Sequence, residues 1–226
     1  FILLSGGLDS CVVLAIARQE TMVQTALTIV YGQRHERELQ SARAICQHYK
    51  IDHLDLNIPL GVLIKDATAL LNPDEELPSG RSVEEMASGI PRTYVPGRNT
   101  IMLAIAQSIA EAYGLDQIYT GFNAVDYSGY VDCRPEFVDS WNALAKFATT
   151  RGVEGNPIEL KTPIIMLPKV EIIKEALRLE APLHLTWSCY RGGSSPCGQC
   201  DSCIIRREAF RNLDLSDPIG EYESGN

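Results

Sequence analysis

Basic residues are scarce in this sequence, and no long apolar run is present. Lysine and arginine together number 20 against 29 aspartates and glutamates, which gives a net charge of −9 and a pI near 5.0. Such an acidic chain lacks the electrostatic footprint of a nucleic-acid-binding protein. No apolar stretch approaches the roughly 20 residues of a membrane-spanning helix. We therefore expect neither nucleic acid nor a membrane among the partners of this protein.

A disulfide framework is missing as well. The seven cysteines are odd in number, and four of them lie between residues 189 and 203. This usage is typical of a reducing compartment and of metal binding, so we expect a cytoplasmic location. The sequence opens inside a strand pattern without a signal peptide, and we expect a short segment to precede it. With 226 residues, 45% of them apolar, the chain suits one α/β domain with a small appendage.

The first loop lacks two well-known phosphate-binding motifs. It contains neither the G-x-x-x-x-G-K-[ST] pattern of kinases and GTPases nor the G-x-G-x-x-G turn of dinucleotide folds. It reads S-G-G-L-D-S over residues 5–10, directly after an apolar run. The glycines allow a tight turn, the serines can donate hydrogen bonds, and the next helix points its amides at the same spot. Asp9 can hold magnesium or a backbone amide. The alternative is an ordinary glycine-rich turn before a capped helix.

Strand and helix patterns alternate along the chain. Strand patterns end at Leu4 and cover residues 23–31, 53–58, 117–120 and 158–162, while helical patterns cover residues 10–19, 36–49, 99–113, 135–149 and 169–179. Residues 72–97 predict a long surface loop. This alternation predicts an α/β fold, a Rossmann-like parallel sheet with helices on both faces. Ligands of such sheets bind at the carboxyl ends of the strands, where the polar segments 5–10, 32–35 and 121–134 would meet.

The clustered cysteines predict a metal site. Cys189, Cys197, Cys200 and Cys203 place four thiolates within fifteen residues, and nearby glycines permit the turns. Four thiolates are the preferred shell of structural Zn²⁺, and an iron–sulfur cluster is the alternative. A shell closed by four sulfurs leaves no position for substrate, so we expect a structural role. Residues 1–180 would form a nucleotide-binding α/β domain, and residues 181–226 a zinc-binding segment packed on it.

Four further segments accompany the first loop and the cysteines. They are Tyr31–His35 (YGQRH), Val95–Asn99 (VPGRN), Asp126–Phe137 (DYSGYVDCRPEF) and Thr186–Tyr190 (TWSCY). The first loop alone resembles the pyrophosphate loop of the ATP pyrophosphatase superfamily, and the whole set resembles the 7-cyano-7-deazaguanine synthase family. The resemblance runs from the first strand to about Phe210. Val131, where we expect proline, and the apolar residues 11–13, where we expect threonines, depart from the family pattern.

The resemblance implies an ATP-dependent C–N ligase of queuosine biosynthesis. Such an enzyme converts 7-carboxy-7-deazaguanine and ammonia into the nitrile 7-cyano-7-deazaguanine, through an adenylate and an amide. Because adenylation supplies the leaving group, the protein mainly positions reactants and stabilises charge. The implied cofactors are ATP, Mg²⁺ and structural Zn²⁺, and the implied assembly is a homodimer.

The resemblance also assigns roles to individual residues. The residues implied to bind ATP are Ser5, Gly6, Gly7, Leu8, Asp9, Ser10, Tyr31 and Gly32. The candidate catalytic residues are Asp9, Ser10, Arg98 and Lys169. Candidates for substrate binding are Arg98, Asn99, Asn123, Asp126, Tyr127, Tyr130, Asp132 and Arg134. Carboxylates, amides and aromatic rings suit the polar edge and the face of a guanine-like ring. On the residues alone, Lys169 could equally begin a solvated helix, and Asn99 could simply cap one.

Three other functions remain open on the sequence. The chain could be another adenylating ligase that forms an amide or modifies tRNA, although its acidic charge disfavours tRNA. It could be a repurposed relative that acts on a protein terminus, although the intact segment Asp126–Phe137 favours a small molecule. It could also be a non-catalytic nucleotide sensor stabilised by zinc.

Overall fold

A parallel β-sheet organises the chain, as the alternating pattern predicts. The computed structural model describes residues 1–33, 36–82, 85–86, 89–126 and 129–223. Within these residues, five strands pair in parallel in the order β3-β2-β1-β4-β5. The strands are β1 (Ile2–Leu3), β2 (Thr25–Val30), β3 (Asp52–Asn57), β4 (Gln117–Tyr119) and β5 (Glu159–Lys161).

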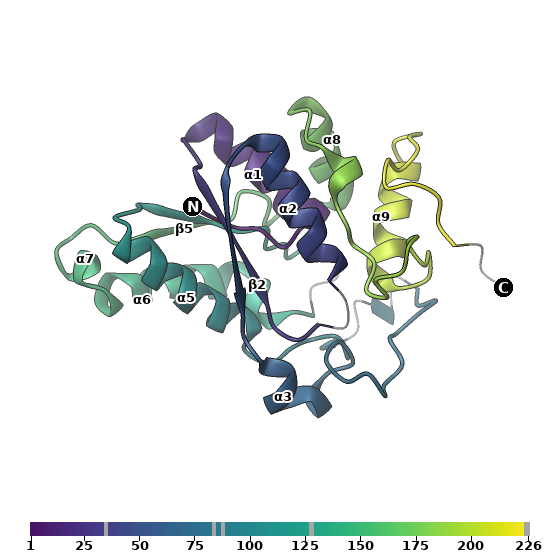
Figure 1. Ribbon diagram of the computed structural model, residues 1–226, viewed down its shortest axis with the longest axis horizontal. Helices are drawn as coiled ribbons and strands as arrows, with labels where there is room; N and C mark the ends of the chain where they lie inside the picture. Colours follow the sequence, from purple (N-terminus) through teal and green to yellow (C-terminus); the bar gives the residue numbers. More distant parts are fainter. Residues whose placement is uncertain (34–35, 83–84, 87–88, 127–128, 224–226) are drawn as a thin grey trace.

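Helices cover both faces of this sheet (Figure 1). The longer helices are α1 (Leu8–Glu20), α2 (Arg37–Tyr49), α5 (Arg98–Ala112), α6 (Pro135–Ala148), α8 (Lys169–Arg178) and α9 (Asp201–Arg211). The shorter ones are α3 (Leu60–Ile64), α7 (Thr150–Val153) and the 3₁₀ segments η1 (Lys65–Ala67), η2 (Val131–Cys133) and η3 (Leu183–Leu185). One apolar core joins α1, α2, α8 and α9 to one face, and a second core joins α5 and α6 to the other. The predicted fold class is therefore confirmed.

The central strand β1 leads directly into the first loop. Ile2 pairs with Ala26 of β2 on one side and with Tyr119 of β4 on the other. Ile2 and Leu4 are 0% and 1% exposed, and burial of such a side chain contributes about 1.5–3 kcal/mol. The strand order runs outward from β1 in both directions, so the crossover connections diverge beside it. A crevice forms at such a point, at the carboxyl ends of the strands.

The C-terminal segment shares the main core of the protein. η3 and α9 contribute Leu183, Ala209 and Phe210 to the apolar cluster that contains α1 and α8. The four cysteines form a smaller cluster of their own, together with Trp187. The cysteine-bearing segment is therefore fastened to the α/β domain by apolar packing.

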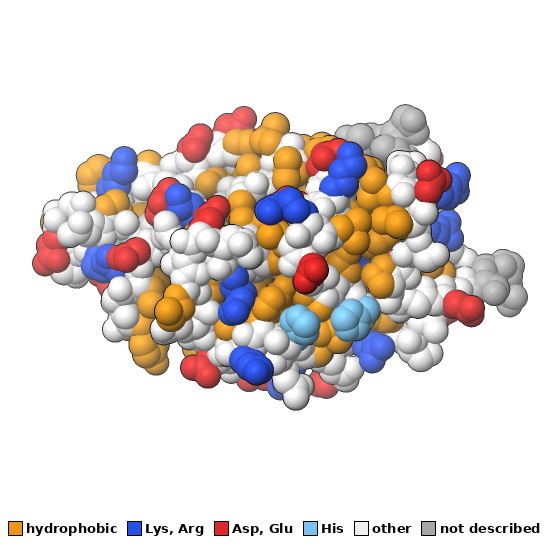
Figure 2. Space-filling view, turned by 90° about the horizontal axis from the view of Figure 1, so that it is seen from above, with side chains coloured by type: hydrophobic (Ala, Val, Ile, Leu, Met, Phe, Trp, Pro, Cys, Tyr) orange, Lys and Arg blue, Asp and Glu red, His pale blue; other side chains and the backbone are white. Residues whose placement is uncertain are grey.

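Charges of both signs are interspersed over the surface. Figure 2 shows Lys and Arg side chains among Asp and Glu side chains, with apolar side chains between them, on the face seen from above. The described side chains of this face form no continuous basic stripe of the kind that follows nucleic-acid phosphates. In the described part of the chain, no helix combines the length and the apolar character needed to cross a bilayer.

Helix starts differ slightly from the expected positions. Helix α1 begins at Leu8 rather than at Ser10, because the extended residue Gly7 already ends the turn. Helix α5 begins at Arg98 after Gly97, whose φ of +65° sets the entry angle. Asn99, which the sequence offered as a possible cap, therefore lies inside this helix.

The long loop is more firmly held than its composition indicates. Gly80 N donates to Gln199 O at 2.9 Å, and Ser79 pairs with Cys200 in an isolated antiparallel bridge. Near the other end of the loop, Arg92 O accepts a hydrogen bond from Ala69 N at 2.9 Å. The described parts of residues 72–97 thus lie across the cysteine cluster and return to the domain.

Gly6 occupies a position that leaves no room for a side chain. Its φ of +86° lies in the left-handed region, and a Cβ would lie 2.8 Å from Ala42 N and closer still to the carbonyl oxygen of Glu38. We expect Gly6→Ala to lower the free energy of unfolding, measured with urea, by about 3 kcal/mol or more. Gly155→Ala is the matched control, because Gly155 has a φ of +89° and no described atom within 4 Å of a built Cβ. Its expected cost is about 1 kcal/mol, and equal losses would contradict the steric argument.

Candidate functional site

The first loop forms a compact turn between β1 and α1. Gly7 N donates to Ser5 Oγ at 3.2 Å, and Ser10 Oγ donates to Gly7 O at 3.1 Å. The hydroxyls of Ser5 and Ser10 lie 3.1 Å apart. The first N–H groups of a helix have no acceptor within it, so they and the helix dipole favour an anion in front of α1. This geometry suits a phosphate group.

A cavity of about 330 Å³ opens in front of this loop, at the carboxyl ends of the strands. It brings together twelve of the predicted site residues: Ser5, Gly7, Leu8, Asp9, Ser10, Tyr31, Arg98, Asn99, Asn123, Asp126, Tyr130 and Lys169. Four others, Gly6, Gly32, Asp132 and Arg134, are absent from the described lining. Tyr127 lies outside the described residues. The expected convergence of the segments after β1, β2 and β4 on one crevice is therefore seen in the structure.

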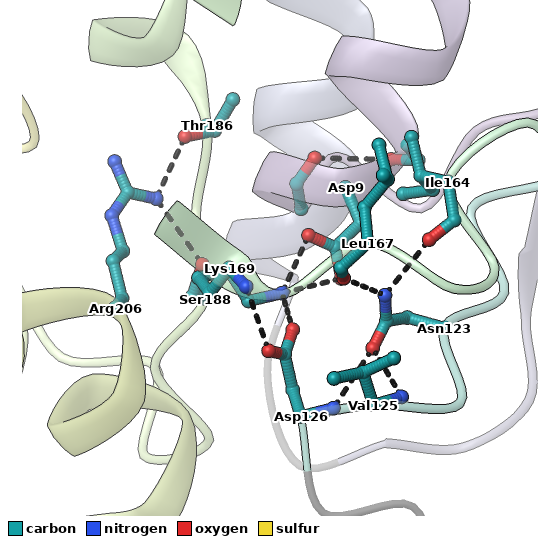
Figure 3. A network of polar contacts seen from close by, with 12 residues as sticks. Asp9, Asn123, Val125, Asp126, Ile164, Leu167, Lys169, Thr186, Ser188 and Arg206 are labelled. Carbon is teal, nitrogen blue, oxygen red and sulfur yellow. Dashed lines mark hydrogen bonds and ion pairs between the residues drawn. The ribbon is translucent and has the colours of Figure 1, made fainter. Parts of the chain in front are cut away.

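Lys169 lies between two carboxylates on the cavity wall (Figure 3). Its Nζ is 2.6 Å and 2.8 Å from the two carboxylate oxygens of Asp9 and 2.8 Å from Asp126 Oδ2. Its backbone N–H, at the start of α8, donates to Asp126 Oδ1 at 2.8 Å. Burial disfavours the charged amine, but the two carboxylates outweigh burial and raise the pKa of Lys169. A permanent positive charge therefore lies beside the phosphate-binding turn.

Asn123 holds the segment that carries Asp126. Its Nδ2 donates to Ile164 O and Leu167 O, at 2.9 Å and 2.7 Å. Its Oδ1 accepts from Val125 N and Asp126 N, both at 3.0 Å. The side-chain amide is thus engaged within the protein (Figure 3). In this structure Asn123 positions Asp126 rather than offering free donors to the cavity.

Arg98 presents a second fixed positive charge. Its Nη1 donates to the Tyr31 hydroxyl at 3.2 Å, and its guanidinium lies 5.5 Å and 5.8 Å from the ring centres of Tyr31 and Tyr130. Burial opposes the charge, but the nearby hydroxyls of Tyr31 and Tyr130 outweigh it and raise the pKa of Arg98. An arginine held between two aromatic rings suits recognition of a planar carboxylate or ring.

Asn99, on the cavity lining, and Asp132, outside the described lining, bond to each other at the start of α5. Asn99 N donates to Asp132 Oδ2 at 3.1 Å, and Asn99 Nδ2 donates to Asp132 O at 3.0 Å and to Cys133 Sγ at 3.2 Å. Asp132 is 4% exposed, so its carboxylate serves the start of α5. Arg134 is exposed at the start of α6.

Several lining residues are not among the site residues predicted from the sequence. They are Glu38, Trp187, Ser188, Tyr190, Ser202 and Arg206, among others. Glu38 lies in the first turn of α2, where an acidic residue is ordinarily explained by the helix dipole. Burial raises the pKa of the Glu38 carboxyl to about 7, against the nearby charge of Arg98 and with a smaller contribution from Cys189. Glu38 follows the YGQRH segment closely in the sequence, and this position could have indicated that it lies near the cavity.

Arg206 fixes the C-terminal side of the cavity. It forms a buried ion pair with Asp217, with Nε 2.8 Å from Oδ2. Its Nη1 donates to Thr186 Oγ1 at 2.8 Å and to Ser188 Oγ at 3.1 Å (Figure 3). Because its donors are used within the protein, Arg206 shapes the segment 186–188 that closes one side of the cavity.

The four cysteines form a buried group that could hold a metal ion. Their sulfur atoms all lie within 4.8 Å of one another. Cys197 N points to Cys189 Sγ and Cys200 N to Cys197 Sγ, each at 3.4 Å. Amide hydrogen bonds of this kind stabilise thiolates, and four thiolates fit the tetrahedral shell of structural zinc. No other group of three or more metal-ligating side chains occurs among the described residues.

The long loop connects the cysteines to the cavity wall. Arg81 forms an ion pair with Asp201, which is 1% exposed and lies directly after Cys200. At the other end of the loop, the hydroxyls of Thr93 and Tyr130 lie 2.7 Å apart. The described parts of this loop therefore contact the cysteine segment at Ser79 and Arg81 and the cavity wall at Thr93.

Removal of the Lys169 charge should leave two half-buried carboxylates without their shared cation. We expect Lys169→Met to lower the free energy of unfolding, measured with urea, by about 3 kcal/mol. Lys174→Met is the control, because Lys174 lies on the same helix with its side chain 52% exposed and pairs with Glu171. An exposed pair of this kind contributes less than about 1 kcal/mol. Equal losses in the two variants would show that the Lys169 pairs add no stability.

Removal of metal from the cysteines should loosen the long loop. We expect chelation to speed trypsin cleavage after Arg81 by about tenfold or more, because local opening exposes this bond. Cleavage after Lys50, at the exposed end of α2, is the internal control and should keep its rate. Mass spectrometry of the fragments measures both. An unchanged rate after Arg81, or an equal increase at both bonds, would contradict the coupling.

Comparisons with known proteins identify the family of this chain. Residues 1–214 match the model of the family described as "Queuosine biosynthesis protein QueC". The chain is 45% identical over 222 residues to a "7-cyano-7-deazaguanine synthase" of Synechococcus sp. (strain CC9902), with 98% of this chain and 96% of the relative covered. It is 47% identical over 224 residues to the protein of the same name from Cyanothece sp. (strain PCC 7425 / ATCC 29141), with 96% and 97% covered.

A solved structure is similar at a lower level. NMN synthetase from Francisella tularensis matches with a TM-score of 0.47 and 18% sequence identity, over 96% of this chain and 78% of that one. The curated relatives are far more similar in sequence, at 45% and 47% identity against 18%. This chain belongs to the family of queuosine biosynthesis protein QueC.

Proposed function

We propose that this protein is an ATP-dependent enzyme that converts 7-carboxy-7-deazaguanine and ammonia into 7-cyano-7-deazaguanine. The names of its relatives support this proposal. The observation that carries it is the cavity itself, because one wall is the S-G-G-L-D-S loop and another holds Asp126, Tyr130 and Arg98. An anion-binding turn thus faces groups that suit a planar, guanine-like acid.

The chemistry requires the carboxyl oxygen to be activated twice. The substrate carboxylate attacks the α-phosphorus of ATP, the bond to the β-phosphate breaks, and pyrophosphate leaves. Ammonia then displaces AMP from the acyl carbon and gives the amide. Activation of the amide oxygen by a second ATP, followed by loss of a proton and of AMP, gives the nitrile. These steps make the protein a C–N ligase.

The phosphate half of the cavity stabilises the leaving pyrophosphate. The hydroxyls of Ser5 and Ser10, the amides at the start of α1 and the ammonium of Lys169 converge there. Preorganised donors of this kind stabilise the charge that develops on the phosphates. Asp9 offers an oxygen to Mg²⁺ that arrives with ATP, and Lys169 then neutralises phosphate charge. Tyr31 lines the adenine side.

The other half of the cavity binds the deazapurine. Arg98 pairs with the substrate carboxylate, and Tyr130, whose ring lies beside Arg98, offers a face for the ring of the substrate. Asp126, held by Asn123, accepts from the amine edge of the ring once Lys169 engages phosphate. Asp132 holds Asn99, which lies on the cavity lining, by accepting a hydrogen bond from Asn99 N.

Zn²⁺ is the metal that we propose for the four cysteines. Cys189, Cys197, Cys200 and Cys203 supply four thiolates, and Zn²⁺ is held in this way where its role is structural. We further propose a cytoplasmic homodimer. Its interface would include the exposed apolar side chains of Leu144, Phe147 and Val153 on α6 and α7, which are 50%, 80% and 75% exposed.

The activity can be tested with purified protein, ATP, ammonium and 7-carboxy-7-deazaguanine. We expect mass spectrometry to detect an amide intermediate and then the nitrile, which is lighter by one water. Asp9→Ala should lower turnover by a factor of about 1,000, because the site loses a phosphate-side group, and one zinc per chain should remain by elemental analysis. Asp139→Ala is the control, since Asp139 is exposed on α6.

The outcomes separate the proposal from its alternatives. Amide without nitrile would identify an amide-forming ligase. ATP binding without consumption of ATP would identify a nucleotide sensor. Full activity of Asp9→Ala would contradict the role of the first loop, and iron with visible absorbance would contradict the choice of zinc.

A further inference from the structure

The cavity wall contains one acidic side chain that lacks a cationic partner. Among the described residues, three acidic ones line the cavity: Asp9, Glu38 and Asp126. Lys169 contacts the carboxylates of Asp9 and Asp126. The described residues donate no hydrogen bond to the Glu38 side chain and form no ion pair with it. Its carboxylate is therefore available to a ligand.

The backbone of Glu38 is fixed against the phosphate-binding turn. Gly6 approaches α2 so closely that a Cβ would collide with the carbonyl oxygen of Glu38. The neighbouring Arg37 stacks on Trp187, with 4.8 Å between its guanidinium carbon and the ring centre. Trp187 N in turn donates to Gly6 O at 2.9 Å. The first turn of α2 and the phosphate loop therefore form one rigid unit.

Arg98, a cation whose charge acts on Glu38, is already engaged elsewhere. Arg98 influences the pKa of Glu38 through space, so the two groups share one region of the cavity. However, Arg98 donates to Tyr31 at 3.2 Å and lies between the rings of Tyr31 and Tyr130. A carboxylate beside this arginine would repel an anionic ligand. It would attract a small cation placed next to a carboxylate that Arg98 binds.

Apart from the Mg²⁺ that accompanies ATP and is assigned to Asp9, only one reactant of the proposed function is a cation at neutral pH. ATP and the substrate acid are anions, whereas ammonia is present mostly as ammonium. Resting on that function, we infer that Glu38 is the residue that binds ammonium and places its nitrogen beside the acyl carbon held by Arg98. A bound cation also offsets the cost of keeping an ionised carboxylate half-buried.

The step balances with Glu38 as the first proton acceptor. One proton passes from ammonium to the Glu38 carboxylate, which frees the nitrogen lone pair. The lone pair forms the C–N bond at the acyl carbon, and the C–O bond to AMP breaks with its electron pair on AMP. The nitrogen releases a second proton to solvent as the amide forms. Glu38 thus acts only on the amination and not on the transfer of AMP.

The test compares Glu38→Gln with Glu36→Gln. Both changes remove one negative charge near the start of α2, but Glu36 is exposed and absent from the described cavity lining. We expect Glu38→Gln to raise KM for ammonium by about tenfold to a hundredfold, as expected for the loss of one charge-assisted contact. KM for ATP and for 7-carboxy-7-deazaguanine should stay within about twofold, as should all constants of Glu36→Gln.

Two further measurements isolate the amination step. Pyrophosphate exchange into ATP that depends on 7-carboxy-7-deazaguanine, without ammonia, should persist in Glu38→Gln. Hydroxylamine, which is uncharged at neutral pH, should react with the variant and with the native enzyme at similar rates. Glu38→Asp keeps the charge on a shorter side chain and should give an intermediate KM for ammonium. If Glu38→Gln fails to fold, the KM of Glu38→Asp for ammonium is the quantity that tests the inference.

Several outcomes would overturn the inference. An unchanged KM for ammonium would remove Glu38 from the amination. A rise in KM for the deazaguanine acid alone would instead make Glu38 a receptor for the ring. Equal loss with hydroxylamine and ammonium would indicate a structural role. If the native enzyme neither exchanges pyrophosphate nor consumes ATP with these substrates, the proposed function itself fails.

Discussion

The ion pairs of Lys169 tie the cavity together. Its ammonium joins Asp9 of the turn after β1 to Asp126 of the segment after β4, and its own helix α8 follows β5. Three connections that are far apart in the sequence are thus fixed around one charge. A half-buried cluster of this kind is stable only while its charges remain paired. Because the two carboxylates need a paired cation, the Lys169 ammonium stays beside the turn where phosphate charge must be neutralised.

A second constraint is the close contact between the first loop and α2. Gly6 has no side chain, so the backbone of Glu38 can approach it, and Trp187 N completes the contact from the C-terminal segment. The phosphate turn is therefore held by α2 and by the C-terminal segment before any ligand binds. Preorganisation of this kind lowers the cost of ordering the site when ATP arrives. The cysteine cluster contributes because Trp187 packs directly against it.

Much of the fold and of the phosphate site could be predicted from local patterns. Apolar strand runs followed by helical periodicity indicate a parallel sheet, and the S-G-G-L-D-S turn lies where such a sheet binds ligands. The roles of Asn123, Asp132 and Glu38 could not be predicted in this way. The bonds of Asn123 reach Ile164 and Leu167, those of Asp132 reach Asn99, and Glu38 meets the cavity only through the packing of α2.

The sequence by itself determined the element order, the phosphate turn, the four clustered thiols and the family resemblance. Each of these depends on residue types at short spacing, which local chemistry fixes. The tertiary structure decided which polar side chains face the cavity and which support it. Asp126 and Asp132 lie on one segment, yet one pairs with Lys169 at the cavity and the other is buried against α5. Their difference arises from packing between distant elements, because each carboxylate takes the partner that the fold brings within reach.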